Sequence, residues 1–113
     1  MKLVIVGSRS FNNYNLLKDT INKYDNIKLI ISNSAIGADK LAEQYPKEYN
    51  IETKIYLPDW NKYGKKAGPI RNELIIKDCD IVIAFWDGES RRTLSSINIA
   101  KTLNKKLKLI KLN

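Results

Sequence analysis

The sequence contains no histidine and a single cysteine. Without histidine the chain cannot form the Ser-His-Asp or Cys-His arrangements of hydrolases, the HExxH zinc motif, or a histidine-based pH switch. Cys79 cannot form an internal disulfide, and its place just before an apolar run favours a buried structural thiol over a nucleophile. We therefore expect a protein of the reducing cytoplasm, with no metal and no cofactor.

Long apolar runs are also missing. Residues 1–7 contain too short an apolar stretch for a signal peptide or a membrane span, and no later segment is long enough to span a bilayer. We therefore expect no role at a membrane. The sequence shows no repeat, linker or low-complexity tract, so the 113 residues should form a single domain, 1–113.

Acidic residues are the minority. Lys and Arg number 20 against 12 Asp and Glu, which gives a formal net charge of +8. Such an excess favours an anionic partner, either a nucleotide or a nucleic acid. The lysines accompany many Asn and Ile residues, however, so a compositional bias explains the excess equally well.

What the sequence does contain is a regular alternation of apolar runs and helical patterns. Apolar runs typical of buried strands occur at 3–6, 28–32, 52–57, 81–86 and 107–112. Apolar residues at helical spacing occur in between, at 16–24, 38–49, 69–75 and 93–103. Pro46 should kink or end the second helix. The alternation predicts an α/β protein, a Rossmann-like five-stranded parallel sheet in the order 3-2-1-4-5 with helices on both faces.

Polar loops follow the first four predicted strands. In open parallel sheets the ligand crevice lies beyond the carboxyl ends of the strands, where the winding direction reverses, here between strands 1 and 4. Helices begin at or near these loops, and their free N–H groups and positive dipole ends favour phosphate. We expect these ligand-binding residues: Gly7, Ser8, Arg9, Asn33, Ser34, Ala35, Gly37, Asp39, Asp59, Trp60, Gly68, Arg71, Asn72, Trp86, Asp87, Ser90, Arg92 and Thr93.

Several of these residues suit a nucleotide. Gly7 allows close approach of the backbone, Ser8 supplies a hydroxyl, and Arg9 supplies a guanidinium fork for two phosphate oxygens. Arg71 follows an Ala-Gly-Pro turn and should reach the crevice as well. The rings of the two tryptophans, which follow strands in polar loops, are placed to stack on a base.

The same residues also have purely structural interpretations. Gly7 can simply end a strand, and Ser8 and Ser90 can cap a turn and a helix. Asp39 can complement a helix dipole instead of contacting a ribose hydroxyl. Each tryptophan can cover the top of the core. The sequence alone leaves both interpretations open.

Several stretches together resemble the YspA-like family of the SLOG superfamily. They are 36–43 (IGADKLAE), 58–60 (PDW), 63–72 (YGKKAGPIRN) and 83–90 (IAFWDGES) with Thr93. The resemblance covers nearly the whole chain in the right order. It implies a Rossmann-like domain that binds nucleotides or nucleotide-derived signals, often in bacterial and phage conflict systems and commonly as an oligomer. SLOG relatives include phosphoribohydrolases, molybdenum-cofactor carriers and DNA-processing proteins.

The chain departs from the family pattern in two loops. Residues 33–34 (Asn-Ser) stand where the family usually has two glycines, and Arg92 stands in place of another. The side chains of Asn33, Arg91 and Arg92 should therefore replace backbone contacts to the ligand.

A third departure concerns catalysis. Phosphoribohydrolase relatives place a glutamate just after the threonine that Thr93 resembles, whereas Leu94 and two serines follow here. The acid expected to assist glycosidic cleavage is therefore missing.

Three functions follow from these observations. The first is non-catalytic binding, as a sensor or a sequestering protein, of a nucleotide-derived, phosphate-bearing small molecule such as an ADP-ribose-like or cyclic nucleotide signal. The second is a hydrolase that uses Asp39, Asp87 or Glu89 as acid or base. The third is a nucleic-acid-binding module whose electrostatic footprint would be Lys101, Lys105, Lys106, Lys108 and Lys111. The incomplete acid–base set favours the first, and we expect a homo-oligomer.

Overall fold

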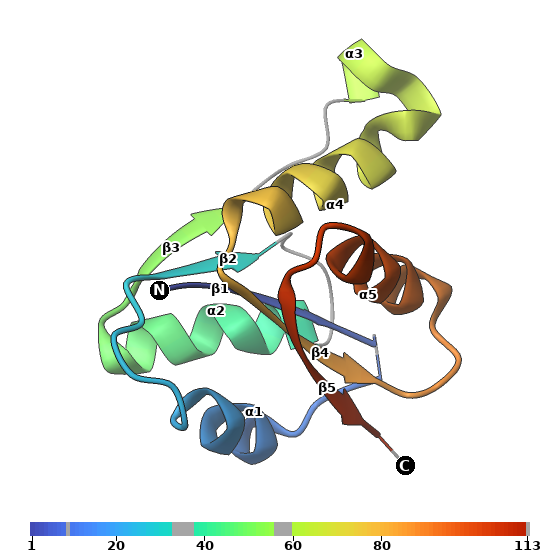
Figure 1. The fold of residues 1–113 in the computed structure, drawn as a ribbon. Coiled ribbons are helices and arrows are strands. Elements are labelled where there is room, and N and C mark those ends of the chain that lie inside the picture. Colours follow the sequence, from blue (N-terminus) through green and yellow to red (C-terminus); the bar gives the residue numbers. More distant parts are fainter. Residues whose placement is uncertain (9, 33–37, 56–59, 113) are drawn as a thin grey trace.

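Five strands form one parallel sheet in the order β3-β2-β1-β4-β5, as the sequence predicts. The computed structural model describes residues 1–8, 10–32, 38–55 and 60–112 (Figure 1). The strands are β1 (Lys2–Gly7), β2 (Leu29–Ser32), β3 (Glu52–Ile55), β4 (Ile81–Trp86) and β5 (Lys106–Lys111). The helices are α1 (Tyr14–Ile21), α2 (Ala38–Tyr49), α3 (Trp60–Tyr63), α4 (Ala67–Asp78) and α5 (Arg91–Thr102).

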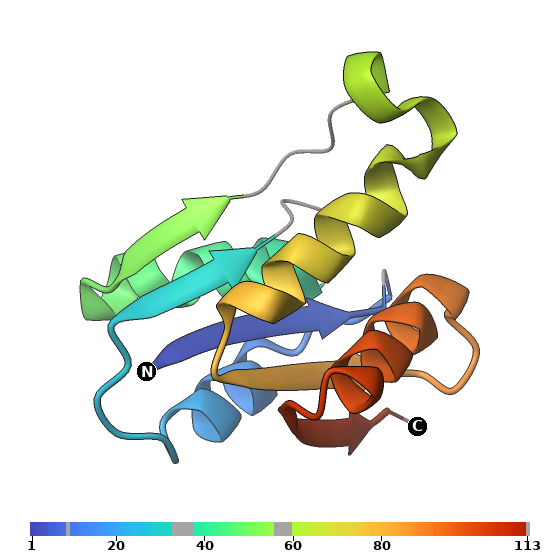
Figure 2. The same ribbon diagram turned by 45° about the horizontal axis from the view of Figure 1, so that its top comes forward.

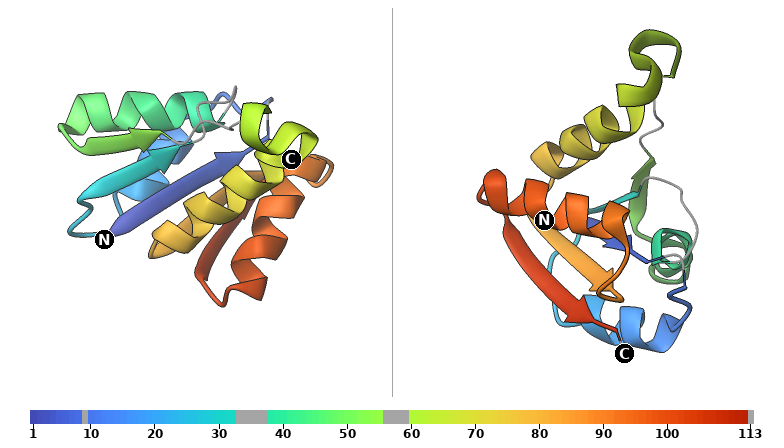
Figure 3. Two further views of the ribbon diagram at one scale, coloured as in Figure 1. Left: turned by 90° about the horizontal axis from the view of Figure 1, so that it is seen from above. Right: turned by 90° about the vertical axis from the view of Figure 1, so that its right-hand side faces the viewer.

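Helices cover both faces of the sheet, because β1 and β4 are apolar on both sides (Figure 3). Leu3 and Ile5 point towards α1 and α2, where Phe11 stacks on Phe85 with ring centroids 4.5 Å apart. The intervening residues of β1 pack on the opposite side with Ile76 and Ile97 of α4 and α5. The predicted two-sided arrangement is confirmed.

The register of the sheet sets the position of the crevice. Gly7 at the end of β1 lies opposite Phe85, and Trp86 at the end of β4 lies opposite Lys111 of β5. All strands run in the same direction, so these three strand ends meet at one edge (Figure 2). The loops that leave this edge are the ones expected to hold a ligand.

Pro46 does not end the second helix, in contrast to the prediction. Helix α2 continues to Tyr49, and Pro46 itself is buried. A proline removes one intrahelical hydrogen bond, and this loss is tolerable so close to the end of a helix whose inner side is packed. The N–H of Ile51 then donates to the Pro46 carbonyl over 2.9 Å and closes the helix end.

The segment before α4 is more regular than expected. It contains helix α3 and a single 3-10 turn (Gly64–Lys66), after which α4 starts two residues before Pro69. Proline is well suited to a first turn, as predicted, because its fixed φ is helical and its missing N–H needs no partner there. Helix α3 projects beyond the sheet at the N-terminal end of α4 (Figures 1 and 2).

Cys79 is a buried thiol, in agreement with the prediction. It is 3% exposed at the end of α4, and its Sγ donates to the carbonyl of Ile76. Burial raises the pKa of this thiol to about 11. Within the described ranges no helix is long and apolar enough to cross a membrane.

Candidate functional site

The ends of the two central strands are joined through Ser8. The backbone N–H of Ser8 donates to the carbonyl of Phe85 over 3.0 Å, and its hydroxyl accepts the N–H of Asp87 over 3.1 Å. Ser8 is only 1% exposed. Its role is therefore to lock the end of β1 to the end of β4, which agrees with its structural interpretation.

Asp87 shapes the loop between β4 and α5. One carboxylate oxygen accepts the backbone N–H groups of Glu89 and Ser90, each over 2.8 Å. These two bonds, with a further contribution from the Ser8 hydroxyl, lower the pKa of Asp87 below its usual value. The carboxylate is therefore ionised at neutral pH.

Ser90 caps helix α5. Its Oγ accepts the N–H of Thr93 over 3.4 Å and lies 3.1 Å from the Thr93 hydroxyl, which is itself buried. The capping interpretation of Ser90 holds, and it positions Arg91 and Arg92 in the first turn. The first backbone N–H groups of a helix have no intrahelical acceptor, so this turn carries partial positive charge beside the two guanidinium groups.

These residues surround an open hollow of about 400 Å³, which we call the β1–β4 crevice. Its lining consists of Gly7, Ser10, Asp87, Ser90, Arg91 and Arg92. Two arginines against one carboxylate leave the lining with a net positive charge. Since guanidinium groups make paired bonds to phosphate oxygens, the crevice has the chemistry of an anion site.

A second hollow, of about 470 Å³, adjoins the crevice and shares Ser10 and Asp87 with it. Asn12, Asn13 and Lys111 contribute polar groups, and Leu16 contributes an apolar one. The sequence analysis did not assign these residues to the site. The predicted parallel pairing of strands 4 and 5 carried the signal for Lys111, because it places the end of strand 5 beside Trp86.

Trp86 is half-buried and packs against the core cluster under α4 and α5. Its indole N–H donates to the Ser90 carbonyl over 3.1 Å. The ring therefore covers the top of the core and supports the loop that carries Ser90. Contact between Trp86 and a base stays a prediction.

The expected site residues of α3 and α4 lie apart from the crevice lining. Trp60 is 59% exposed and lies next to Gly68, where an added methyl group would meet the ring at 3.8 Å. Asn72 is 7% exposed, and its carbonyl oxygen accepts the Nε–H of the half-buried Arg71 over 3.2 Å. None of these residues lines the β1–β4 crevice. Their contact with a ligand remains a prediction.

Several expected residues cannot be placed. Arg9, Asn33, Ser34, Ala35, Gly37 and Asp59 lie outside the described residues, as does the side chain of Asp39. Among the residues that the structure describes, no group of three Cys, Asp or Glu side chains is arranged to hold a metal ion.

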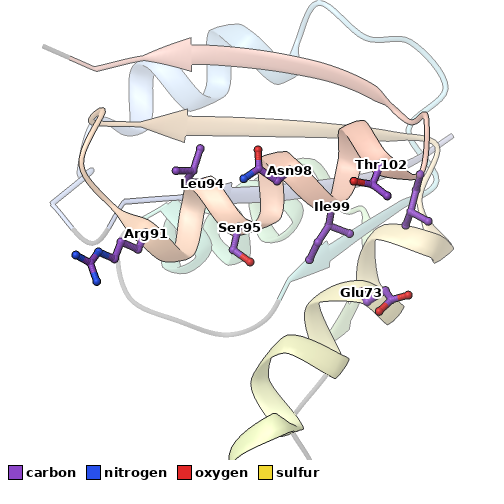
Figure 4. A pocket seen from close by; sticks show the side chains of 8 residues that line it. Glu73, Arg91, Leu94, Ser95, Asn98, Ile99 and Thr102 are labelled. Atoms are coloured by element: carbon purple, nitrogen blue, oxygen red, sulfur yellow. The ribbon is translucent and has the colours of Figure 1, made fainter.

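A third hollow, of about 460 Å³, runs along α5 and faces α4 (Figure 4). Leu94, Ser95 and Asn98 line it from α5, and Glu73 faces them from α4. Arg91 stands at the end near the β1–β4 crevice. The groove lies on the outer surface of the helix layer and brings together no cluster of cations.

Comparison with known proteins places this geometry in a family. A model of the "YspA, cpYpsA-related SLOG family" matches residues 1–63. The chain is also similar to "Gene 61 protein" of Mycobacterium phage D29, with 27% identity over 99 residues, covering 79% of each chain. The family match spans β1, β2, β3 and α3 and stops before α4.

Proposed function

Because the chain belongs to the YspA, cpYpsA-related SLOG family, we propose that it binds a nucleotide-derived, phosphate-bearing small molecule in the β1–β4 crevice. Membership of the SLOG superfamily indicates a nucleotide-related ligand. The location rests on one observation, the convergence of Arg91, Arg92 and the first turn of α5 on a hollow beside the end of β1. Parallel α/β sheets bind ligands at this edge.

In this proposal the phosphate lies against the first turn of α5. Arg91 and Arg92 donate to its oxygens, together with the backbone N–H groups of the same turn. The ionised Asp87 carboxylate repels phosphate but accepts hydrogen bonds from ribose hydroxyls, so it separates the sugar from the phosphate end. The adjoining hollow, with Asn12, Asn13 and Lys111, has room for the rest of the ligand.

We propose binding without turnover. Asp87 has a lowered pKa and is a poor proton donor at neutral pH. Leu94 stands where phosphoribohydrolase relatives place their glutamate, and its side chain lies on the outer groove of α5. A protein of this kind acts by sensing or sequestering its ligand, and the similarity to a phage protein fits a role in conflict between phage and host.

Isothermal titration calorimetry with AMP and with ADP-ribose tests the site. Arg92→Ala should weaken binding by about 1.5–3 kcal/mol, the range for hydrogen bonds to a charged group. Lys101→Ala removes an exposed cation from the other end of α5 and should leave the affinity within about twofold. Arg71→Ala tests the sequence-based expectation that Arg71 also reaches the ligand. Equal losses for Arg92→Ala and Lys101→Ala would contradict the proposed location.

The hydrolase alternative has a separate test. The protein is incubated with the same nucleotides and the mixture is separated by chromatography. Binding without turnover predicts that the nucleotide is recovered intact. Release of a free base or of phosphate above the level of a no-protein control would establish catalysis instead.

A further inference from the structure

Residues 60–66, which we call the aromatic–basic arm, are exposed throughout their length. The arm consists of α3 and the following 3-10 turn and projects beyond the sheet (Figures 1 and 2). Trp60 is 59% exposed and Tyr63 is 37% exposed. Two large rings on one short projecting segment present an apolar surface that the domain itself does not cover.

The same segment is strongly basic. Its sequence, WNKYGKK, contains three lysines and no acidic residue. The Nζ of Lys62 lies 5.1 Å from the centroid of the Tyr63 ring, so an ammonium group and an aromatic face are side by side. Lys65 and Lys66 are exposed in the next turn. Cation and ring therefore occur together, within seven residues.

We propose that the aromatic–basic arm binds single-stranded nucleic acid. Unpaired bases stack on exposed aromatic rings, and the phosphates between them attract neighbouring lysines. The arm supplies both groups at the spacing of adjacent residues. This surface differs from the β1–β4 crevice, since none of its residues lines that hollow.

Charge favours this partner over a second copy of the chain. The whole chain carries a formal charge of +8, so a second copy would bring like charge to three lysines. A polyanion neutralises them instead. A lipid surface fits less well, because residues 60–66 contain no aliphatic side chain and membrane binding grows with the apolar area inserted.

The lysines of the C-terminal region are less suited to form the main footprint. Lys105 donates to the backbone carbonyls of Lys77 and Cys79, over 3.2 and 2.9 Å, so its ammonium group caps the end of α4. Lys111 lines the hollow beside Asp87. These lysines are divided between different parts of the molecule, whereas those of the arm are contiguous and flanked by rings.

The experiment measures fluorescence anisotropy of a labelled single-stranded oligothymidine as the protein is added at low salt. The wild type should bind, with an affinity that falls as salt rises. Trp60→Ala should weaken binding by about tenfold through lost stacking. Lys65→Glu with Lys66→Glu should weaken it by at least about tenfold and reduce the slope of log K against log salt by about one.

The matched control is Lys106→Glu with Lys108→Glu, which makes the same charge change on exposed residues of β5. Its affinity should stay within about threefold of the wild type, because exposed charges beyond about 10 Å are largely screened. All variants change exposed side chains, and circular dichroism should show an unchanged fold. Saturating AMP should leave oligothymidine binding intact, since the two sites are distinct.

Four results would overturn the proposal. The first is no binding of oligothymidine by the wild type at low salt. The second is an equal loss in the β5 control. The third is competition by AMP, which would place the oligonucleotide in the crevice. The fourth is binding of phosphatidylserine vesicles through the arm without binding of oligothymidine, which would assign the surface to a membrane.

Discussion

Ser8 is the residue on which the geometry of the crevice depends most directly. It is 1% exposed, and it bonds to β4 through both its backbone N–H and its hydroxyl. Strand pairing alone would bring β1 and β4 together, but it would not orient the chain beyond Trp86. The Ser8 hydroxyl does this by holding the N–H of Asp87, whose carboxylate in turn organises the loop before α5.

Ser8→Ala tests this role. The substitution leaves the N–H of Asp87 without its acceptor, and an unsatisfied buried donor costs about 1–3 kcal/mol. We expect a loss of this size in the free energy of unfolding, measured by urea denaturation with circular dichroism. Ser10→Ala is the control, since Ser10 is exposed, and it should change stability by no more than about 0.5 kcal/mol. Equal stability of Ser8→Ala and wild type would show that the bond has no structural role.

Helices α1 and α2 are joined by a polar cluster on the face away from α4 and α5. The Tyr14 hydroxyl donates to the Glu48 carboxylate, and Lys18 forms an ion pair with the same carboxylate over 3.1 Å. The rings of Tyr45 and Tyr49 stack with centroids 4.4 Å apart. The cluster adds a polar connection to the apolar packing beneath these two helices.

The hydrogen bond of Tyr14 predicts a dependence of stability on alkaline pH. Burial, followed by the bond to Glu48, raises the pKa of Tyr14 from 10.0 to about 12. A folded-state pKa above the unfolded value gives stability that is complete below pH 10 and is lost as the pH rises through about 12. The difference in unfolding free energy between wild type and Tyr14→Phe should therefore be constant from neutral pH to about pH 9 and shrink above it.

Urea denaturation across this pH range measures the difference. Tyr63→Phe serves as the control, since Tyr63 lies on the projecting arm and makes no bond to Glu48. Its difference from the wild type should stay flat at every pH. The loss for Tyr14→Phe should be smaller than that for Ser8→Ala, because its contact is exposed. A Tyr14→Phe difference that grows above pH 10 would contradict the assignment.

At the scale of the whole molecule, stability is concentrated in the two central strands. Residues 3–6 of β1 and 81–85 of β4 are all buried, whereas every residue of β5 is exposed or half-buried. Backbone amides of the central strands should exchange with solvent only on global unfolding, since both sides of these strands are covered. Amides of β5 should exchange faster through local opening at the sheet edge.

Hydrogen–deuterium exchange followed by mass spectrometry tests this distribution. Peptides that cover β1 and β4 should retain deuterium-free amides longest, and peptides that cover β5 and the aromatic–basic arm should exchange first. If β5 were protected as strongly as β1, an additional chain would have to cover its edge. That result would also bear on the oligomeric state, which stays a prediction from the family resemblance.

Much of the fold follows from local patterns in the sequence. The buried strand at 81–86 is visible as an uninterrupted apolar run, because both of its faces contact helices. The lysines that alternate with apolar residues in the last strand indicate an edge position, as the structure confirms. Strict alternation of strands and helices then leaves few topologies, because crossovers between parallel strands are right-handed.

The details of the site are less accessible from the sequence. Trp86 and Ser90 were each open to two interpretations, and the bond between the indole N–H and the Ser90 carbonyl became visible only in three dimensions. The sequence also could not show that Arg91 and Asp87 line one hollow while Asn72 turns into the core. Side chains of the same type and spacing can point either way, and packing against distant elements selects between them.

By itself, then, the sequence determined the α/β class, the order of the strands and the edge of the sheet at which a ligand would bind. These properties depend on hydrophobic periodicity and chain connectivity, which are local. Only the tertiary structure decided which polar groups share the β1–β4 crevice, and that Lys111 joins its neighbouring hollow while Trp60 stands on a projecting arm. Those relations join residues far apart in the chain, and they exist only once the packed helices and the register of the sheet bring them together.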